Sequence, residues 1–163
     1  MAYESETVKR IIHSLKYEGY YLLSRPIAKL MSEYLKSSGL LDAIGISGFI
    51  LVPIPLHPSR LKERGYNQSA LISRELGAKT GMPIYDVLSR KRKTKEQAEI
   101  KDTKERLKNV SGCFVLRKNE DVKGKNILLV DDVFTSGATM FEAARVLYRA
   151  GAAKVFGLAT AKA

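Results

Sequence analysis

The stretch ILLVDDVFTSGAT, from Ile127 to Thr139, places four apolar residues directly before two adjacent carboxylates. The apolar run is typical of a strand buried on both faces of a parallel sheet, and the small residues after the carboxylates favour a turn into a helix. Ligands of open parallel sheets bind beyond the carboxyl ends of the strands. Asp131 and Asp132 are therefore expected to border a ligand site.

The segment after the two aspartates has the composition of a phosphate site. It consists of Thr135, Ser136, Gly137, Ala138 and Thr139. Its backbone N–H groups and three hydroxyls lie at the positive end of a helix predicted over 137–150. The glycine permits a left-handed backbone, and the alanine leaves space for an anion. The same pattern is also compatible with plain turn residues and a helix cap.

The carboxylates cannot bind the phosphate themselves, because like charges repel. They must face hydroxyl donors or a divalent cation. Two neighbouring hydroxyls beside one phosphate describe a ribose 5-phosphate, so the stretch predicts a phosphosugar site with Asp131 and Asp132 at the sugar.

Outward from this stretch, short apolar runs alternate with amphipathic segments. Alternation of this kind indicates an α/β fold with a mostly parallel sheet flanked by helices. We expect a single domain over 1–163, with a helical N-terminal segment at 1–45 and an α/β core at 46–163. The first predicted strand begins at Phe49, and four others cover 84–88, 113–116, 126–130 and 155–161. The predicted helices cover 5–17, 24–37, 67–79 and 137–150.

One segment, 90–108, is too polar for a regular assignment. It reads RKRKTKEQAEIKDTKERLK, with nine Lys or Arg, four Asp or Glu and three apolar residues. A long polar insertion in a compact α/β domain is usually a functional lid or a disordered excursion. The segment is therefore predicted to be a mobile basic loop.

Composition excludes several classes of protein. With 28 Lys and Arg against 17 Asp and Glu, the 163-residue chain has a formal charge of 28 − 17 = +11, and 45% of its residues are apolar. These values fit a basic globular domain. The longest uncharged stretch, 43–59, contains three prolines and cannot be a spanning helix, and no secretory signal is evident, so the cytoplasm is expected. One cysteine and two histidines predict neither an internal disulfide nor a zinc site.

The strand, the two acidic residues and the Thr/Ser/Gly loop resemble the motif with which phosphoribosyltransferases bind 5-phosphoribosyl-1-pyrophosphate (PRPP). Further stretches are similar to the ComF/GntX family of competence-associated phosphoribosyltransferase-like proteins. This resemblance implies a Rossmann-like type I phosphoribosyltransferase fold with a small N-terminal helical hood. The four cysteines of the zinc module found in many members are missing here, so zinc is not carried over. The similar stretches are IIHSLKYEGYY (11–21), VPIPLHPSRLKERGYNQSA (52–70), the pattern of Arg92, Thr94 and Gln97, and ERLKNVSGCF (105–114).

The resemblance also implies roles for individual residues. Asp131 and Asp132 would receive the ribose hydroxyls and form the catalytic set with Arg92. Mg²⁺ would bridge the pyrophosphate, with the two aspartates as further metal ligands. Thr94 and Gln97 would belong to a flexible loop over the site. The residues expected at the 5-phosphate are Thr135, Ser136, Gly137, Ala138 and Thr139, and those expected at the pyrophosphate are His57, Arg60 and Arg64, with Lys62 nearby.

Simpler interpretations exist for the last group. His57 is favoured as a side chain that fixes its turn over a ligand contact or a general acid. The three cations that follow it are also compatible with a solvated first helical turn.

Two functions from different classes follow from these observations. In the first, the protein is an enzyme that moves phosphoribose from PRPP to an acceptor that the sequence does not identify. In the second, it is a DNA-uptake accessory that binds single-stranded DNA through its basic surface, with PRPP as a regulatory ligand only. A PRPP-binding regulator without catalysis is a third hypothesis, and the resemblance is compatible with a homodimer. The tyrosines available for base stacking are Tyr17, Tyr20, Tyr21 and Tyr66.

Overall fold

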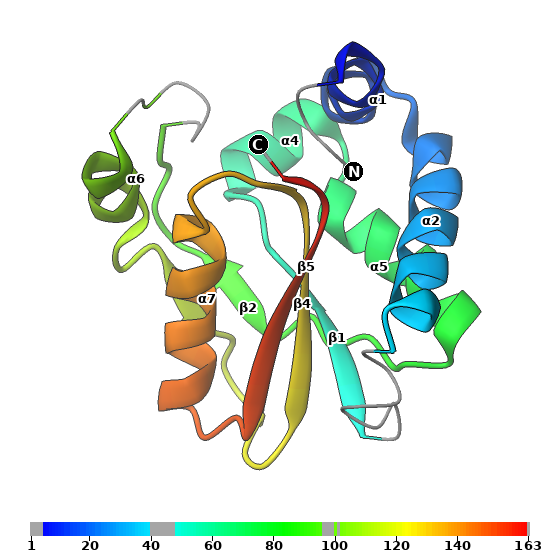
Figure 1. Ribbon diagram of the computed structural model, residues 1–163. Coiled ribbons are helices and arrows are strands. Elements are labelled where there is room, and N and C mark those ends of the chain that lie inside the picture. The colour runs from blue at the N-terminus through cyan, green and yellow to red at the C-terminus, as the bar shows by residue number, and fades with distance from the viewer. Residues whose placement is uncertain (1–4, 40–47, 96–99, 101, 163) are drawn as a thin grey trace.

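The computed structural model describes residues 5–39, 48–95, 100 and 102–162, and the structural statements below refer to these residues. The chain forms two sheets surrounded by helices (Figure 1). In chain order the elements are α1 (Glu6–Tyr17), η1 (Tyr21–Leu23), α2 (Ser24–Ser37), β1 (Phe49–Pro53), α4 (Pro58–Arg64), α5 (Gln68–Thr80), β2 (Leu88–Arg90), α6 (Thr103–Val110), β3 (Phe114–Leu116), β4 (Asn126–Phe134), α7 (Ala138–Arg149) and β5 (Lys154–Lys162).

The main sheet is parallel, in the order β1-β4-β5, which confirms the predicted α/β class. Its central strand is β4, the strand that carries the two aspartates. All five residues of β1 are buried, as expected for a strand covered on both faces. The carboxyl ends of β1 and β4 therefore meet at one edge, where α1 and α4 lie (Figure 1).

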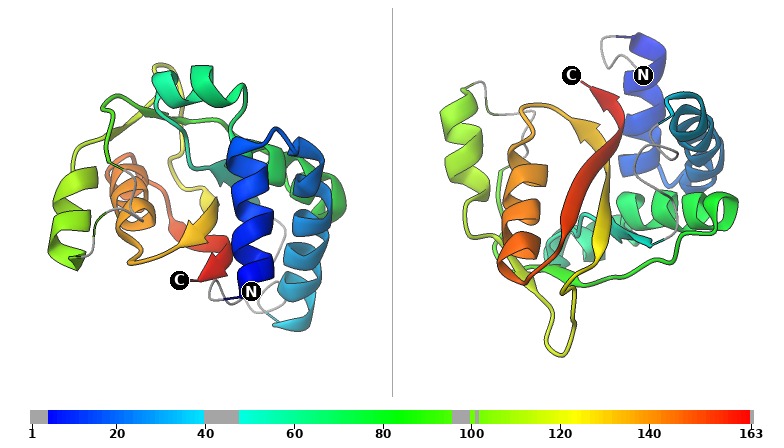
Figure 2. Two further views of the ribbon diagram at one scale, coloured as in Figure 1. Left: turned by 90° about the horizontal axis from the view of Figure 1, so that it is seen from above. Right: turned by 60° about the horizontal axis from the view of Figure 1, so that its bottom comes forward.

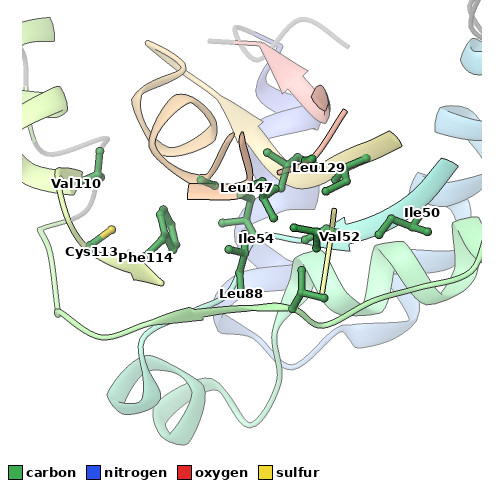
Figure 3. Close-up of a cluster of buried hydrophobic side chains, with 14 of the residues drawn as sticks. Ile50, Val52, Ile54, Leu88, Val110, Cys113, Phe114, Leu129 and Leu147 are labelled. Atoms are coloured by element: carbon green, nitrogen blue, oxygen red, sulfur yellow. The ribbon is translucent and has the colours of Figure 1, made fainter. Parts of the chain in front are cut away.

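Helices cover both faces of this sheet. On one face α5 packs on β1 and β4, and α2 packs on α5. On the other face α7 lies against β4 and β5, and Figure 3 shows its Leu147 converging with Leu129 of β4 and Phe114 of β3. Each face of the sheet carries a cluster of buried, mostly aliphatic and aromatic side chains, one beneath α7 and one beneath α2 and α5. The sheet is therefore the middle layer of the core.

The predicted strand at 84–88 is wrong. Ile84 forms only an isolated parallel bridge with Leu51, and the regular strand β2 begins at Leu88. Val87 and Leu88 are fully buried in the core beside Phe114. Packing into that cluster draws the chain away from β1, so that β2 pairs antiparallel with β3 in a separate two-stranded sheet.

The prediction of an irregular loop over 90–108 is wrong for Arg90 and for 103–108, which belong to β2 and α6, whereas 91–95 form neither a helix nor a strand. Arg90 ends β2, and α6 begins after Asp102, whose side chain accepts a hydrogen bond from the Glu105 N–H at 2.9 Å. A cap of this kind stabilises a helix by about 1 kcal/mol. Val110 at the other end of the helix is buried against the α7 side of the core. The cap and this anchor outweigh the high charge, and residues 96–99 and 101 lie outside the described part.

The N-terminal helices are confirmed at almost the predicted bounds. Val8 and Ile12 of α1 pack against Ala161 of β5, and Leu15 belongs to the core cluster of α2 and α5. Seen from above in Figure 2, α1 lies beside the ends of β4 and β5. The next residue, Lys16, is thereby held over the end of the central strand. No helix among the described residues is long and apolar enough to cross a membrane.

Candidate functional site

The two aspartates form the floor of a cavity at the carboxyl end of β4. Asp131 is 9% and Asp132 is 4% exposed. They lie inside the strand, because β4 continues to Phe134 in register with Lys162 of β5. The cavity is lined by Lys16, Ile54, Leu56, Arg60, Arg64, Gln68, Ser69, Arg90, Lys95, Asp131, Asp132, Val133, Thr135 and Thr139.

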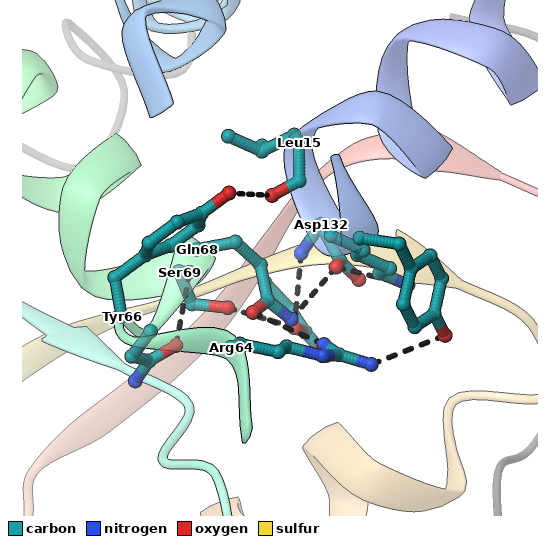
Figure 4. A network of polar contacts seen from close by, with 10 residues as sticks. Leu15, Arg64, Tyr66, Gln68, Ser69 and Asp132 are labelled. Carbon is teal, nitrogen blue, oxygen red and sulfur yellow. Dashed lines mark hydrogen bonds and ion pairs between the residues drawn. The ribbon is translucent and has the colours of Figure 1, made fainter. Parts of the chain in front are cut away.

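Protein donors from two helices hold the aspartates in place (Figure 4). The Ser69 hydroxyl donates to Asp131 Oδ1 at 3.0 Å. The Gln68 amide donates to Asp132 Oδ2 at 2.9 Å, and the Lys16 ammonium lies 3.0 Å from the same oxygen. Asn67 caps α5 by accepting from the Ser69 N–H, which places Gln68 and Ser69 in the first turn of that helix.

Burial and mutual repulsion control the charge of this pair. Burial, followed by the charge of Asp132, raises the pKa of Asp131 to about 7. Burial alone would lower the pKa of Lys16, but the attraction of Asp132 and Asp131 outweighs it and raises that pKa. The ammonium therefore stays charged and offsets part of the negative charge of the aspartates.

The predicted phosphate loop lies on one side of the aspartates. Gly137 has φ 77°, and a Cβ atom there would come within 2.7 Å of the Phe134 and Phe141 rings. The tight turn starts α7 at Ala138, a residue that is 1% exposed. The Ser136 hydroxyl oxygen is buried and has no hydrogen-bond partner among the described residues. A buried hydroxyl without a partner at a helix N-terminus fits an anion that accepts from it.

Basic side chains line the other side of the cavity. Arg90 is only 9% exposed, its Nη2 donates to the Thr94 hydroxyl, and its guanidinium lies 5.3 Å from the centroid of the Phe114 ring. Its Nε is buried without a partner in the described part of the chain, and burial lowers the pKa of Arg90. Arg60 donates to the Thr94 carbonyl at 3.0 Å. Within the described residues no carboxylate is bonded to this buried guanidinium, an arrangement that is costly and favours an anionic ligand.

Most of the predicted site residues are brought together, but not all of them. Arg60, Arg64, Thr135 and Thr139 line the cavity beside the aspartates. Arg64 also donates to the Tyr17 hydroxyl at 3.1 Å and to Gln68 at 3.3 Å, so it links α4 to the N-terminal hood.

Arg92 and His57 lie elsewhere. Arg92 donates to the carbonyls of Asn109 and Ser111 and is not among the lining residues, so its catalytic role stays a prediction that the geometry does not favour. His57 caps α4 by accepting from the Ser59 N–H, which agrees with its interpretation as a side chain that fixes the turn.

Three further predicted residues have separate outcomes. Lys62 is exposed on α4 and does not line the cavity. Thr94 is buried; its carbonyl accepts from Arg60 and its hydroxyl accepts from Arg90, so it orients both arginines. Gln97 lies outside the described residues.

Sequence reasoning missed several members of the site, namely Lys16, Gln68, Ser69, Arg90 and Lys95. The stretches that resemble the ComF/GntX family include Lys16, Gln68 and Ser69. That resemblance was the sequence signal that could have identified these three as site residues. Arg90 opens the basic run at 90–108, where its charge could not be told apart from those of its solvated neighbours. Only packing against Phe114 and Thr94 distinguishes it.

The donor set tests whether the aspartates fit a metal ion. Mg²⁺ requires free carboxylate or water oxygens in near-octahedral geometry. Asp132 Oδ2 already carries the Lys16 ammonium and the Gln68 amide, and Asp131 Oδ1 carries the Ser69 hydroxyl and the Asp132 N–H. No group of three or more His, Cys, Asp or Glu residues suited to a metal ion occurs among the residues described. At these two oxygens a directly bound cation would compete with protein hydrogen-bond donors.

Comparison with known proteins agrees with this arrangement. A family model described as the phosphoribosyl transferase domain matches residues 61–161. Competence protein ComFC of Bacillus subtilis is 37% identical over 105 residues, and competence protein F of Haemophilus influenzae is 30% identical over 161 residues. The matched segments cover 64% and 96% of this chain, respectively. The chain spans 40% of the length of the first relative and 69% of the second.

A solved structure shows the same fold. Glutamine PRPP amidotransferase from B. subtilis superposes on 85% of this chain with a TM-score of 0.52, at 18% sequence identity and over 26% of its own chain. At this identity the likeness concerns the fold alone.

Proposed function

The chain belongs to the ComF family of phosphoribosyltransferase-domain proteins, and on that premise we propose that it binds PRPP in this cavity and transfers the phosphoribosyl group to an acceptor. The names of its relatives link the family to competence, and we extend the proposal to a role in DNA uptake.

One observation carries the proposal. A buried carboxylate pair lies between a loop suited to a phosphate and a group of arginines that includes the buried Arg90. A ligand that matches this order has an anion at each end and hydroxyls in the middle. PRPP has this form, with a 5-phosphate, two ribose hydroxyls and a pyrophosphate on C1.

The residues of the site account for each step of the proposed transfer. The C1–O bond to pyrophosphate breaks while a bond from C1 to the acceptor forms, and positive charge develops on the ribose ring. Arg90 and Arg60 stabilise the negative charge on the leaving pyrophosphate. Asp131 and Asp132, both buried, orient the ribose through its hydroxyls.

Mg²⁺ enters this proposal only as a companion of the ligand. It is expected on the pyrophosphate oxygens, since Mg²⁺ prefers substrate phosphates to an all-protein cage. The chain's own carboxylates are already hydrogen-bonded to protein donors.

The first test is a calorimetric titration of PRPP with Mg²⁺ into the wild type and into the Asp131→Asn/Asp132→Asn variant. We expect binding by the wild type and at least about a hundred-fold weaker binding by the variant, because amides replace the charged acceptor at Asp132 and the carboxyl group at Asp131. Asp86→Asn is the matched control, since Asp86 forms an exposed ion pair with Arg117 outside the cavity. Equal binding by the double variant would contradict the proposal.

Pyrophosphate release then separates an enzyme from a regulator. The protein with bound PRPP is incubated with nucleobases, amines and nucleic acids, and released pyrophosphate is measured by a coupled assay. Release that depends on one acceptor supports the transferase. Tight PRPP binding without release for every acceptor would instead support the PRPP-binding regulator.

Single-stranded DNA binding is the second candidate function, and one surface favours it. Tyr17, Tyr20 and Tyr21 are about half exposed where α1 meets η1. Tyr20 lines a hollow of about 940 Å³ together with the cations Lys9 and Arg10 and the carboxylates Glu6 and Glu18. Exposed aromatic rings next to cations are suited to stacked bases and phosphates. Tyr66 does not belong to this surface, because its hydroxyl donates to the Leu15 carbonyl at 2.6 Å.

Fluorescence anisotropy with a labelled oligothymidylate tests this candidate. We expect affinity that falls steeply with salt and falls again in Tyr20→Ala/Tyr21→Ala. Tyr148→Ala, an exposed tyrosine of α7, is the matched control. Binding that is absent, or unchanged by salt, would remove this function.

A further inference from the structure

We propose that the Lys16 ammonium takes the role that a divalent cation would otherwise have at the carboxylate pair, so that ribose is recognised there without a bound metal. The inference rests on the proposed function, because it concerns the same cavity. It assigns a positioning role to Lys16, a residue of the N-terminal hood. It also predicts that the carboxylate pair recognises ribose without a metal ion.

The position of the ammonium supports this role. Lys16 Nζ lies 3.0 Å from Asp132 Oδ2, and the side chain is 21% exposed among the residues that line the cavity. Charges of both aspartates act on it and raise its pKa. An ammonium has three N–H donors, so donors beyond the one facing Asp132 are available for ribose hydroxyl oxygens.

One oxygen of each aspartate already has two protein partners. The Gln68 amide shares Asp132 Oδ2 with Lys16, and the Ser69 hydroxyl and the Asp132 N–H share Asp131 Oδ1. All of these partners are hydrogen-bond donors, and a cation repels donors. A metal ion bound directly to Asp132 Oδ2 or Asp131 Oδ1 would have to displace at least one of them.

Lys16 is also held in place by its neighbours on α1. Leu15 is fully buried, and its carbonyl accepts the 2.6 Å hydrogen bond from Tyr66. On the other side, the Tyr17 hydroxyl accepts from Arg64 at 3.1 Å, and the guanidinium lies 4.7 Å from the Tyr17 ring centroid. The helix turn that carries Lys16 is thus fixed to α4 and to the connection between α4 and α5, and this holds the ammonium in a defined position before a ligand binds.

A purely structural ion pair is the competing interpretation. Such a pair would stabilise the fold, and its loss would change ligand affinity equally with and without metal. The proposal instead predicts that loss of Lys16 creates a metal requirement that the wild type lacks.

The test uses ribose 5-phosphate, which has the phosphate and hydroxyls of PRPP but no pyrophosphate to bring Mg²⁺ into the site. Its affinity is measured by calorimetry in EDTA and in millimolar Mg²⁺, for the wild type, Lys16→Met and Lys16→Arg. We expect equal wild-type affinity in both buffers and about ten-fold or greater weakening of Lys16→Met in EDTA, partly restored by Mg²⁺. Lys16→Arg keeps a cation and should remain independent of metal.

Lys29→Met is the matched control, since Lys29 forms an exposed pair with Glu33 on α2, away from the cavity. It should bind like the wild type in both buffers. Circular dichroism melting curves establish that each variant is folded. If Lys16→Met is unstable, the affinity of the wild type for ribose 5-phosphate in EDTA and in Mg²⁺ still decides whether ribose recognition needs a metal ion.

A metal readout completes the experiment. Mn²⁺ alone is titrated and followed by electron paramagnetic resonance, which reports bound ion without any ligand. The wild type should leave Mn²⁺ free, and Lys16→Met should bind it at the vacated position. Wild-type affinity for ribose 5-phosphate that is lost in EDTA, or wild-type binding of Mn²⁺, would overturn the inference.

Failure of the proposed function gives a different result. In that case the wild type would bind neither ribose 5-phosphate nor PRPP in either buffer. Binding of both ligands only with metal would leave the proposed function intact and contradict the role of Lys16 alone.

Discussion

The Gln68 side-chain amide donates to Asp132 Oδ2 over 2.9 Å, although the two residues lie 64 positions apart in the chain. Both are 4% exposed, so the hydrogen bond is shielded from water. It fastens the first turn of α5 to the central strand and presents the aspartate to the cavity. Hydrogen bonds to a buried charge are among the stronger ones in proteins.

Replacing Gln68 tests this contact. In Gln68→Leu the buried Asp132 loses a donor, and we expect unfolding in urea to require about 1–3 kcal/mol less free energy. Ser73→Ala is the control, because the buried Ser73 hydroxyl donates only to the Ser69 carbonyl within α5. Equal stability losses in the two variants would show that the bond to Asp132 has no special weight.

Gly137→Ala should damage both stability and phosphate binding. Its positive φ costs an L-residue roughly 1–2 kcal/mol, and the new Cβ would also collide with the Phe134 and Phe141 rings. Gly81→Ala has a similar φ of 75° with nothing within 4 Å of the new Cβ, and therefore isolates the backbone cost. Thermal melting should show the larger loss for Gly137→Ala, and calorimetry with ribose 5-phosphate should show lost binding for that variant only.

The raised pKa of Asp131 predicts how the stability of the fold changes with pH. Its pKa is raised from 3.8 to about 7, so between these values the folded protein holds a proton that the unfolded chain has released. The stabilisation from this group is complete below about pH 4 and is lost as pH rises through about 7. The loss amounts to at most about 4 kcal/mol, since each pKa unit corresponds to about 1.36 kcal/mol.

Asp131→Asn should remove the pH dependence of stability that Asp131 causes. Urea unfolding of the variant and the wild type at a series of pH values between 4 and 8 measures it, and the variant should gain relative stability toward the alkaline end. Parallel curves for the two proteins would mean that Asp131 ionises normally in the folded state.

Arg90→Met should separate stability from binding. The substitution replaces a buried cation, whose Nε has no partner in the described structure, with an apolar chain of similar length. We expect unchanged or higher thermal stability and at least about ten-fold weaker PRPP binding. Arg117→Met removes a half-exposed arginine outside the cavity and should not affect binding. A destabilised Arg90→Met that binds PRPP normally would indicate a structural arginine.

The positions of the residues at the centre of the cavity could be predicted from the sequence because their signal is local. Apolar residues, two carboxylates and the loop of Thr135 to Thr139 are consecutive, and one strand–turn–helix unit positions them. The N-terminal helices were equally predictable, since each carries a clear apolar face.

The rest of the site depends on contacts between distant segments. Lys16, Gln68 and Arg90 reach the cavity from α1, α5 and β2, and nothing in the local pattern of each segment shows where its polar side chains point. The same limit explains the errors at 84–88 and at α6. In both places a few buried residues, such as Leu88 and Val110, decide the structure against the local composition.

The strand order has a consequence for synthesis of the chain. Phe49 of β1 pairs with Asn126 of β4, so 126 − 49 = 77 residues must be added before the first strand has its partner. At ribosomal rates this takes roughly 4–15 s. During that interval the five apolar residues of β1 have no neighbouring β4, and a nascent chain that stops before Asn126 would expose them to proteases and chaperones.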